Sequence, residues 1–281
     1  MTEDRFGSRR RTIGVVVGTA VAYVVVAMLG HGAARASALA VPLTPGLVVA
    51  LGLVLGPVVA WGAGAGYVAV DLLTGAFGPT TAVGYLGQFV LVVTAHRLWG
   101  AFGPLSSGTD PGVRTPRNAL EYGLVVATTA LITAAITGFG TAMLAESPFA
   151  ATVGPRVRGT LLSTLVVGAP LLYALAPLAD RVDRRVSRLT VDGGTATAWW
   201  NVPTGWWVAA VGLAWCVAGY GISFVFRDVG LTSTHLLINR LGRGVLPILA
   251  VAGPDGRYLQ LVVGGTLAAA YVVLVVGIPF R

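Results

Sequence analysis

The stretch of sequence that decides the fold covers residues 45–99 and reads PGLVVALGLVLGPVVAWGAGAGYVAVDLLTGAFGPTTAVGYLGQFVLVVTAHRLW. Almost every residue in it is apolar, glycine recurs at short intervals, and one carboxylate, Asp71, lies deep inside. Because an isolated carboxylate is costly in hydrocarbon, a charged residue in such a stretch is by default a candidate functional residue. Residues 43–99 therefore predict a Gly-rich membrane hairpin organised around Asp71.

The composition of the whole chain extends this prediction to every other segment. Of its 281 residues, 55% are hydrophobic and 11% are charged, and the mean hydropathy is +0.80. Soluble domains carry about 25% charged residues. Several apolar runs approach the ~20 residues that cross a bilayer, and they lack the short alternation of barrel strands. We therefore predict an all-α fold, a polytopic integral membrane helical bundle.

Hydropathy and turn residues predict about eight transmembrane helices in this bundle. A short loop with Pro155, Arg156 and Arg158 is expected before the sixth of them. The first span is interpreted as a retained anchor, with a cleaved signal peptide as the alternative. The eight predicted spans cover residues 12–29, 45–60, 62–77, 82–99, 119–144, 160–178, 205 to about 226, and 258–278.

The spans fall into a six-span bundle at 1–180, a charged loop at 181–204, and two further spans at 205–281. Residues 228–256 carry Arg240 and Arg243 opposite an apolar stripe, so we expect an outer-side interfacial or re-entrant helix there. With the N-terminus inside, most of the 19 arginines lie on the inner side. This bias predicts a multi-pass plasma-membrane protein with both termini in the cytoplasm.

Several residue types exclude classes of function. The chain has no lysine, which excludes a retinal Schiff base, a P-loop lysine and a catalytic lysine nucleophile. Cys216 is alone, and the three histidines lack ligand spacing, so we expect no metal site. No hydrolase, metalloprotease, P-loop or kinase signature is present. We therefore expect no enzyme activity and no cofactor. Membrane topology accounts for the net charge of +8, so no nucleic acid is expected as a partner.

Helical spacing gives Asp71 a set of polar neighbours. On one face of a helix it lies with Tyr67 and Thr74, and the facing stripe of the next span holds Tyr85 and Gln88. With the turn centred near residue 79, Asp71 and Gln88 lie at nearly equal depth, ~12–14 Å below it. We therefore predict that Asp71 contacts Gln88 or Tyr85.

These five residues are the predicted ligand- or ion-binding residues. The alternative is that Asp71 is a helix-packing residue, neutral or satisfied by tyrosine and threonine hydroxyls. Glu121, near the start of the fifth span, is interpreted as a favourable charge at a helix N-terminus. Small residues at four-residue spacing permit close helix approach. The predicted helix-packing residues are Gly14, Gly18, Ala22, Gly52, Gly56, Gly62 and Gly66.

Residues 42–103 resemble the substrate-binding (S) components of energy-coupling-factor vitamin transporters. The resemblance is carried by Gly56-Pro57, which ends a short span, and by Asp71-Leu72-Leu73-Thr74-Gly75, which ends a Gly-rich span. Those components have six spans, as residues 1–180 do here. The resemblance implies that the first helix docks a transmembrane coupling subunit through small residues, the role that Gly14, Gly18 and Ala22 would have. Similar Pro-Gly hairpins occur in membrane-embedded sensor domains.

Two functional hypotheses follow from these patterns. The first is a membrane-embedded small-molecule binding or transport subunit with an outward-facing pocket near Asp71. The alternative is a structural or sensory subunit of a membrane complex. The expected partners are the lipid bilayer and either coupling and ATPase subunits or other subunits of a membrane complex. The chain has no ATP-binding motif of its own, so an ATP-driven step requires such a partner.

Overall fold

A computed structural model describes residues 3–36, 42–107, 112–144, 148–175, 177, 203–224 and 257–277. Within these ranges every regular element is a helix, which confirms the all-α prediction. Residues 181–202 of the predicted loop at 181–204, and the predicted interfacial or re-entrant segment 228–256, lie outside the described residues. The elements are α1 (Glu3–Ala36), α2 (Thr44–Leu55), α3 (Val59–Thr74), α4 (Pro79–Leu98), η1 (Gly103–Leu105), α5 (Pro116–Leu144), α6 (Phe149–Ser163), η2 (Thr164–Gly168), α8 (Thr204–Ser223) and α11 (Arg257–Gly277).

Five described segments are long and apolar enough to cross a membrane, so the prediction of about eight spans is not supported. α2 and α3 have 12 and 16 residues, or ~18 and ~24 Å, which is shorter than a hydrocarbon core of ~30 Å. Gly56 separates them with a φ of 88°, a conformation that favours glycine. The five segments are Arg10–Gly32, Pro116–Leu144, Phe149–Leu175, Thr204–Ser223 and Tyr258–Gly277.

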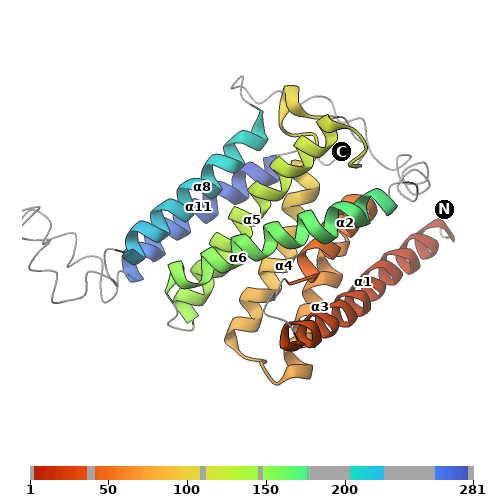
Figure 1. Cartoon of the computed structure of the whole chain (residues 1–281), viewed down its shortest axis with the longest axis horizontal. Helices are drawn as coiled ribbons and strands as arrows, with labels where there is room; N and C mark the ends of the chain where they lie inside the picture. Colours follow the sequence, from red (N-terminus) through yellow and green to blue (C-terminus); the bar gives the residue numbers. More distant parts are fainter. Residues whose placement is uncertain are drawn as a thin grey trace, which may run out of the picture.

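The described helices pack mostly against their neighbours in the sequence (Figure 1). α1 lies along α3, α3 packs on α4, and α4 packs on α5. α5 then contacts both α6 and α8, and α8 contacts α11. This order places α5 between the N-terminal hairpin and the C-terminal pair of helices, so the buried core runs through it.

The sixth span differs from its prediction. α6 begins at Phe149 rather than near residue 160, and it runs through Pro155. Arg156 and Arg158, which were expected in a loop, therefore lie within a helix. Proline removes one backbone donor from a helix and tends to kink it. In apolar surroundings, however, leaving the helix would expose many more unpaired backbone groups.

A π-helical turn, Thr164–Gly168, continues α6 and forms the docking point of α2. The Tyr122 hydroxyl donates to the Thr164 carbonyl oxygen at 2.7 Å, and the Gly46 N–H donates to the Ser163 hydroxyl at 2.9 Å. A Cβ added at Gly46 would lie 2.8 Å from the Gly168 nitrogen. This close backbone approach fixes the N-terminus of α2 against the middle of the bundle.

Three of the predicted packing glycines lie at close helix contacts on α2 and α3. A Cβ at Gly62 would lie 2.5 Å from the Val16 carbonyl oxygen, and one at Gly66 would lie 2.7 Å from the Tyr23 Cβ. A Cβ at Gly52 would lie 2.6 Å from a methyl carbon of Val92. These positions therefore require a small residue for α1, α2, α3 and α4 to approach closely.

Gly14 and Gly18 of the predicted ladder on α1 meet no other described helix, so their predicted role in docking a partner subunit stays a prediction. A Cβ added at Gly14 or Gly18 would have no atom within 4 Å, and Ala22 is half-buried. Gly56 likewise has open space and serves as the C-cap of α2 instead. α1 buries a different stripe, which consists of Thr19, Tyr23 and Ala27. The four-residue spacing of small residues on α1 therefore did not predict which face of α1 packs against α3.

Candidate functional site

The end of the α3–α4 hairpin sets the register of the candidate site. α3 ends at Thr74, Gly75 follows in the left-handed conformation with a φ of 73°, and α4 begins at Pro79. Proline is favoured at the first position of a helix because its missing N–H would have no partner there. The turn is therefore residues 75–78, and it is not centred on Pro79 as expected. Each residue of α3 consequently faces an earlier residue of α4 than the sequence pattern indicates.

Asp71 is half-buried, and the hydrogen bond described for its side chain comes from Thr81. Asp71 Oδ2 accepts a hydrogen bond from Thr81 Oγ1 at 2.7 Å. The same Thr81 oxygen accepts the Gly78 N–H at 3.0 Å and so caps the start of α4. The predicted contact of Asp71 with Gln88 or Tyr85 is thus replaced by one with Thr81, which sequence reasoning missed. A proline at the first helical position, with threonine two residues later, was the signal that could have found it.

Gln88 lies two turns further along α4, on the same face as Thr81. Its side chain is 6% exposed, and Oε1 has no hydrogen-bond partner among the described residues. Seven residues of helix separate it from Thr81 by ~10.5 Å along the axis. Buried polar atoms are nearly always paired, so an unpaired amide oxygen in the interior indicates a place for water or a ligand. We therefore keep Gln88 in the candidate site, although it makes no hydrogen bond to Asp71.

Tyr67 and Tyr85 pack reciprocally across the hairpin. The Tyr67 ring lies directly against Gly84 on α4, and the Tyr85 ring lies against Gly64 on α3. A Cβ at Gly64 would lie 2.5 Å from Tyr85 Cε2. Tyr85 also stacks on Phe89, with ring centroids 6.4 Å apart. Gly64 and Gly84 therefore make room for two tyrosine rings, of which Tyr67 lies near Asp71.

Arg156 brings a positive charge to this cluster from α6. Its guanidinium interacts electrostatically with the hydroxyl groups of Tyr67 on α3 and of Tyr23 on α1. Asp71 lies near the same two hydroxyl groups. The Tyr23 hydroxyl in turn interacts with Thr44 at the start of α2. An acid, a cation and two phenols from α1, α3 and α6 therefore lie near one another. We call these four residues, with Thr81 beside Asp71 and Gln88 two turns further along α4, the polar cluster.

Thr74 does not belong to the polar cluster. Its side chain is exposed, and Oγ1 donates to the Val70 carbonyl oxygen at 2.9 Å, one turn earlier in its own helix. This is the usual way in which a helical threonine satisfies its hydroxyl. The structure thus gives no reason to keep Thr74 among the predicted binding residues.

Glu121 is the other acid whose side chain the structure describes, and its surroundings correct the prediction made for it. α5 begins at Pro116, so Glu121 lies beyond the first turn, and its side chain is 0% exposed. Its carboxylate accepts the Gly100 N–H and the Ser107 N–H, both at 2.6 Å, and the Ser107 hydroxyl at 2.5 Å. Glu121 therefore fastens the α4–α5 connection to α5, a larger role than an interaction with a helix terminus.

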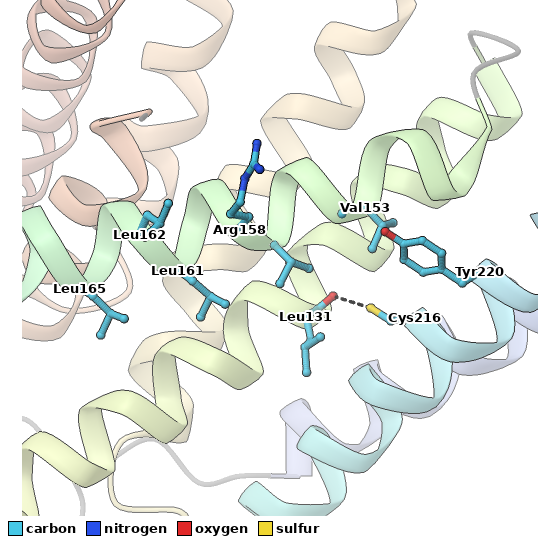
Figure 2. Close-up of a pocket in the computed structure, with 10 residues that line it drawn as sticks. Leu131, Val153, Arg158, Leu161, Leu162, Leu165, Cys216 and Tyr220 are labelled. Carbon is cyan, nitrogen blue, oxygen red and sulfur yellow. Dashed lines mark hydrogen bonds between the residues drawn. The ribbon is translucent and has the colours of Figure 1, made fainter. Parts of the chain in front are cut away.

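Two further observations bound what the candidate site can hold. Within the described residues, no three His, Cys, Asp or Glu side chains are grouped so as to hold a metal ion. A groove lies between α5, α6 and α8 (Figure 2), and Asp71 does not line it. Comparison with protein-family models, with curated proteins and with solved structures finds no match. The functional argument therefore rests on the polar cluster itself.

Proposed function

We propose that this chain is a membrane-embedded subunit that binds a small polar molecule at the polar cluster and, with partners, transports it. The observation that carries the proposal is the buried Gln88 amide oxygen, which has no hydrogen-bond partner among the described residues. Leaving a buried acceptor unpaired costs about 1–3 kcal/mol. A bound molecule that donates to Gln88 would remove that cost.

The chemistry of the cluster defines the class of ligand. Asp71 offers a carboxylate, Arg156 a guanidinium, and Tyr23 and Tyr67 hydroxyl groups that donate or accept. The hydrogen bond described for Asp71 comes from Thr81, which leaves it able to accept a further one. A small molecule with an amine at one end and a carboxylate or phosphate at the other complements these groups. We infer a zwitterionic or cationic metabolite.

The remaining features of the proposal concern the direction of transport. We propose a multi-pass plasma-membrane protein with cytoplasmic termini, so that the α3–α4 turn and the Asp71 end of the cluster open to the outside. The excess of arginines on the predicted inner side supports this orientation. Because the sequence has no ATP-binding motif, coupling to ATP would come from partner subunits.

Thermal stability of the purified full chain in nanodiscs tests the proposal. The probes are the free amino acids and the common biogenic amines, each at millimolar concentration. A ligand present at 100 times its Kd stabilises the folded state by about 2.7 kcal/mol. We expect at least one probe to raise the Tm of the wild type. D71N and Q88L should abolish that rise, whereas T74A should retain it. If no probe stabilises the wild type, or if D71N responds fully, the proposed function is wrong.

A structural or sensory subunit is the second candidate, and the outer face of α1 favours it. Gly14 and Gly18 have open space on this face, beside the exposed side chains of Val17, Val21 and Val25. A partner helix would approach closely there. If assembly is the function, we expect G14L and G18L to release any membrane subunit that copurifies with the chain. G62L is not a suitable control, because it would disrupt the contact between α1 and α3 itself.

A further inference from the structure

Four buried hydroxyls lie where α4, α5 and α11 come together, and none of them belongs to the polar cluster. Thr94 of α4 and Tyr271 of α11 are 0% and 5% exposed, and their hydroxyls share a hydrogen bond of 2.6 Å. Thr129 and Thr133 of α5 are 1% and 3% exposed, and neither hydroxyl has a hydrogen-bond partner among the described residues. Because buried polar atoms are nearly always paired, the two unpaired hydroxyls indicate a place for a bound group. We call these four residues the hydroxyl site.

Close contacts between α4 and α5 show that these two helices run antiparallel. A Cβ added at Gly87 would lie 2.5 Å from Thr137 Cγ2 and 3.9 Å from Thr133 Cγ2. A Cβ added at Gly140 would lie 2.6 Å from a methyl carbon of Val83. Residue numbers therefore rise along α4 as they fall along α5, and the threonine face of α5 packs against Gly87.

This register brings Thr129 to the level of Thr94. Thr94 lies seven residues beyond Gly87, nearly two turns, so it is on the same face of α4 and ~10.5 Å further along. An equal step along α5 from Thr137, the nearer contact of Gly87, ends at residue 130, next to Thr129. Thr129 and Thr133 share a face because they are four residues apart. The hydroxyl site is therefore one location on the α4–α5 interface, and the hydrogen bond of Thr94 brings α11 to it.

The hydrogens of these hydroxyls favour an occupant that accepts hydrogen bonds. Each hydroxyl has one hydrogen to donate. Within the pair of Thr94 and Tyr271, one hydroxyl donates to the other, and the second keeps its hydrogen without an acceptor among the described residues. Thr129 and Thr133 each contribute another such hydrogen. The site thus offers three donors, which is more than the two lone pairs of one water molecule accept.

Arg97 places a positive charge beside the hydroxyl site. It follows Thr94 by three residues, ~4.5 Å along α4, and its guanidinium interacts electrostatically with the Tyr271 hydroxyl. The two described carboxylates, of Asp71 and Glu121, make no hydrogen bond to any of the four hydroxyls. Charges act more strongly on one another in a protein interior than in water, so a guanidinium here favours an anion and disfavours a second cation.

We propose that the hydroxyl site binds a small monovalent anion of the size of chloride. Single hydroxyl donors from three helices suit a spherical ion, whereas carboxylates and phosphates are typically bound by paired donors of one guanidinium. The anion would fasten α11 to α4 and α5. This site is separate from the polar cluster, because Gln88 lies about 100° around α4 from Gly87 and from the face that carries Thr94. The proposal therefore does not depend on the proposed function.

Thermal unfolding of the purified full chain in nanodiscs tests the proposal. The buffers contain N-methylglucamine chloride, bromide or gluconate at equal ionic strength, so that the cation stays the same. We expect the Tm of the wild type to be higher in chloride and bromide than in gluconate, and to saturate with halide concentration. T129V and T133V should each weaken the apparent halide affinity at least about tenfold, because each removes a charge-assisted hydrogen bond. In gluconate both should be at least as stable as the wild type, because an unpaired buried hydroxyl is gone.

The matched control is T137V, on the same face of α5. The Thr137 hydroxyl donates to the Thr133 carbonyl oxygen of its own helix at 2.8 Å, so T137V should keep the wild-type halide response. R97Q should weaken that response, and R97K should retain most of it. Line broadening in the 35Cl NMR spectrum measures binding independently of stability, and it should be lost in T129V.

Two results would overturn the proposal. One is a wild-type Tm that is equal in chloride and gluconate, which would show that the site holds water alone. The other is a full halide response in both T129V and T133V, which would place the halide effect elsewhere on the protein.

Discussion

Two acids of the helical bundle, Asp71 and Glu121, differ in burial from what their sequence positions indicate. Asp71 lies in the middle of an apolar stretch, yet it is half-buried near a turn and accepts one hydrogen bond from Thr81. Glu121 lies near a predicted helix start, yet its side chain is 0% exposed and accepts three hydrogen bonds. For these two acids, the burial of the carboxylate depends on how many hydrogen-bond donors the nearest loop or turn supplies. It does not depend on the hydropathy of the surrounding sequence.

The largest expected effect is the loss of the Glu121 carboxylate. E121A would leave two backbone N–H groups, of Gly100 and Ser107, without an acceptor, at a total cost of about 3 kcal/mol in the free energy of unfolding. D71A would cost about 1 kcal/mol, because Thr81 still caps α4 through the Gly78 N–H. Reversible denaturant titration in detergent measures both values. Equal losses in the two variants would contradict the expected difference in stability between the buried Glu121 and the half-buried Asp71.

A smaller effect is expected at Ser107, which contributes two of the three hydrogen bonds to Glu121. S107A removes the hydroxyl donor and keeps the backbone N–H donor, so we expect a loss of about 1–1.5 kcal/mol. The connection should then exchange its amide protons faster, which hydrogen exchange followed by mass spectrometry detects at residues 100–107. In the E121A background, S107A should cost almost nothing further, because its partner is already absent. Additive losses would show that Ser107 acts independently of Glu121.

Hydropathy and glycine spacing were enough to predict the helical bundle and several of its contacts. Unbroken apolar runs predicted α5 and α11 closely, because long segments have no other way to satisfy their backbone in lipid. The close contacts of Gly62, Gly66 and Gly52 followed from small residues that allow close approach. Asp71 and Tyr67 were also correctly placed together on one face of α3.

Other features depended on tertiary contacts that one sequence does not reveal. Pro155 and the two arginines beside it resemble a loop, but the helix continues through them because α5 packs along its length. Arg156 reaches Tyr67 from a helix 89 positions later in the numbering, a pairing that periodicity within one segment cannot detect. Gly14 and Gly18 have the same spacing as Gly62 and Gly66, yet only the second pair meets another described helix.

The smallest effects compare two threonines at the hairpin end, and they test whether Asp71 is held by Thr81 alone. T81V removes the donor to Asp71 and the cap on the Gly78 N–H, so we expect a loss of about 1 kcal/mol in the free energy of unfolding. T74V removes an exposed hydroxyl that hydrogen-bonds only to its own helix, so its effect should stay within about 0.5 kcal/mol.

A double-mutant cycle with D71N then gives the coupling energy between Asp71 and each threonine. Coupling of D71N with T81V of about 0.5–1 kcal/mol, and none with T74V, is expected. Coupling of D71N with T74V instead would show that the hairpin has a different register and would return Thr74 to the candidate site.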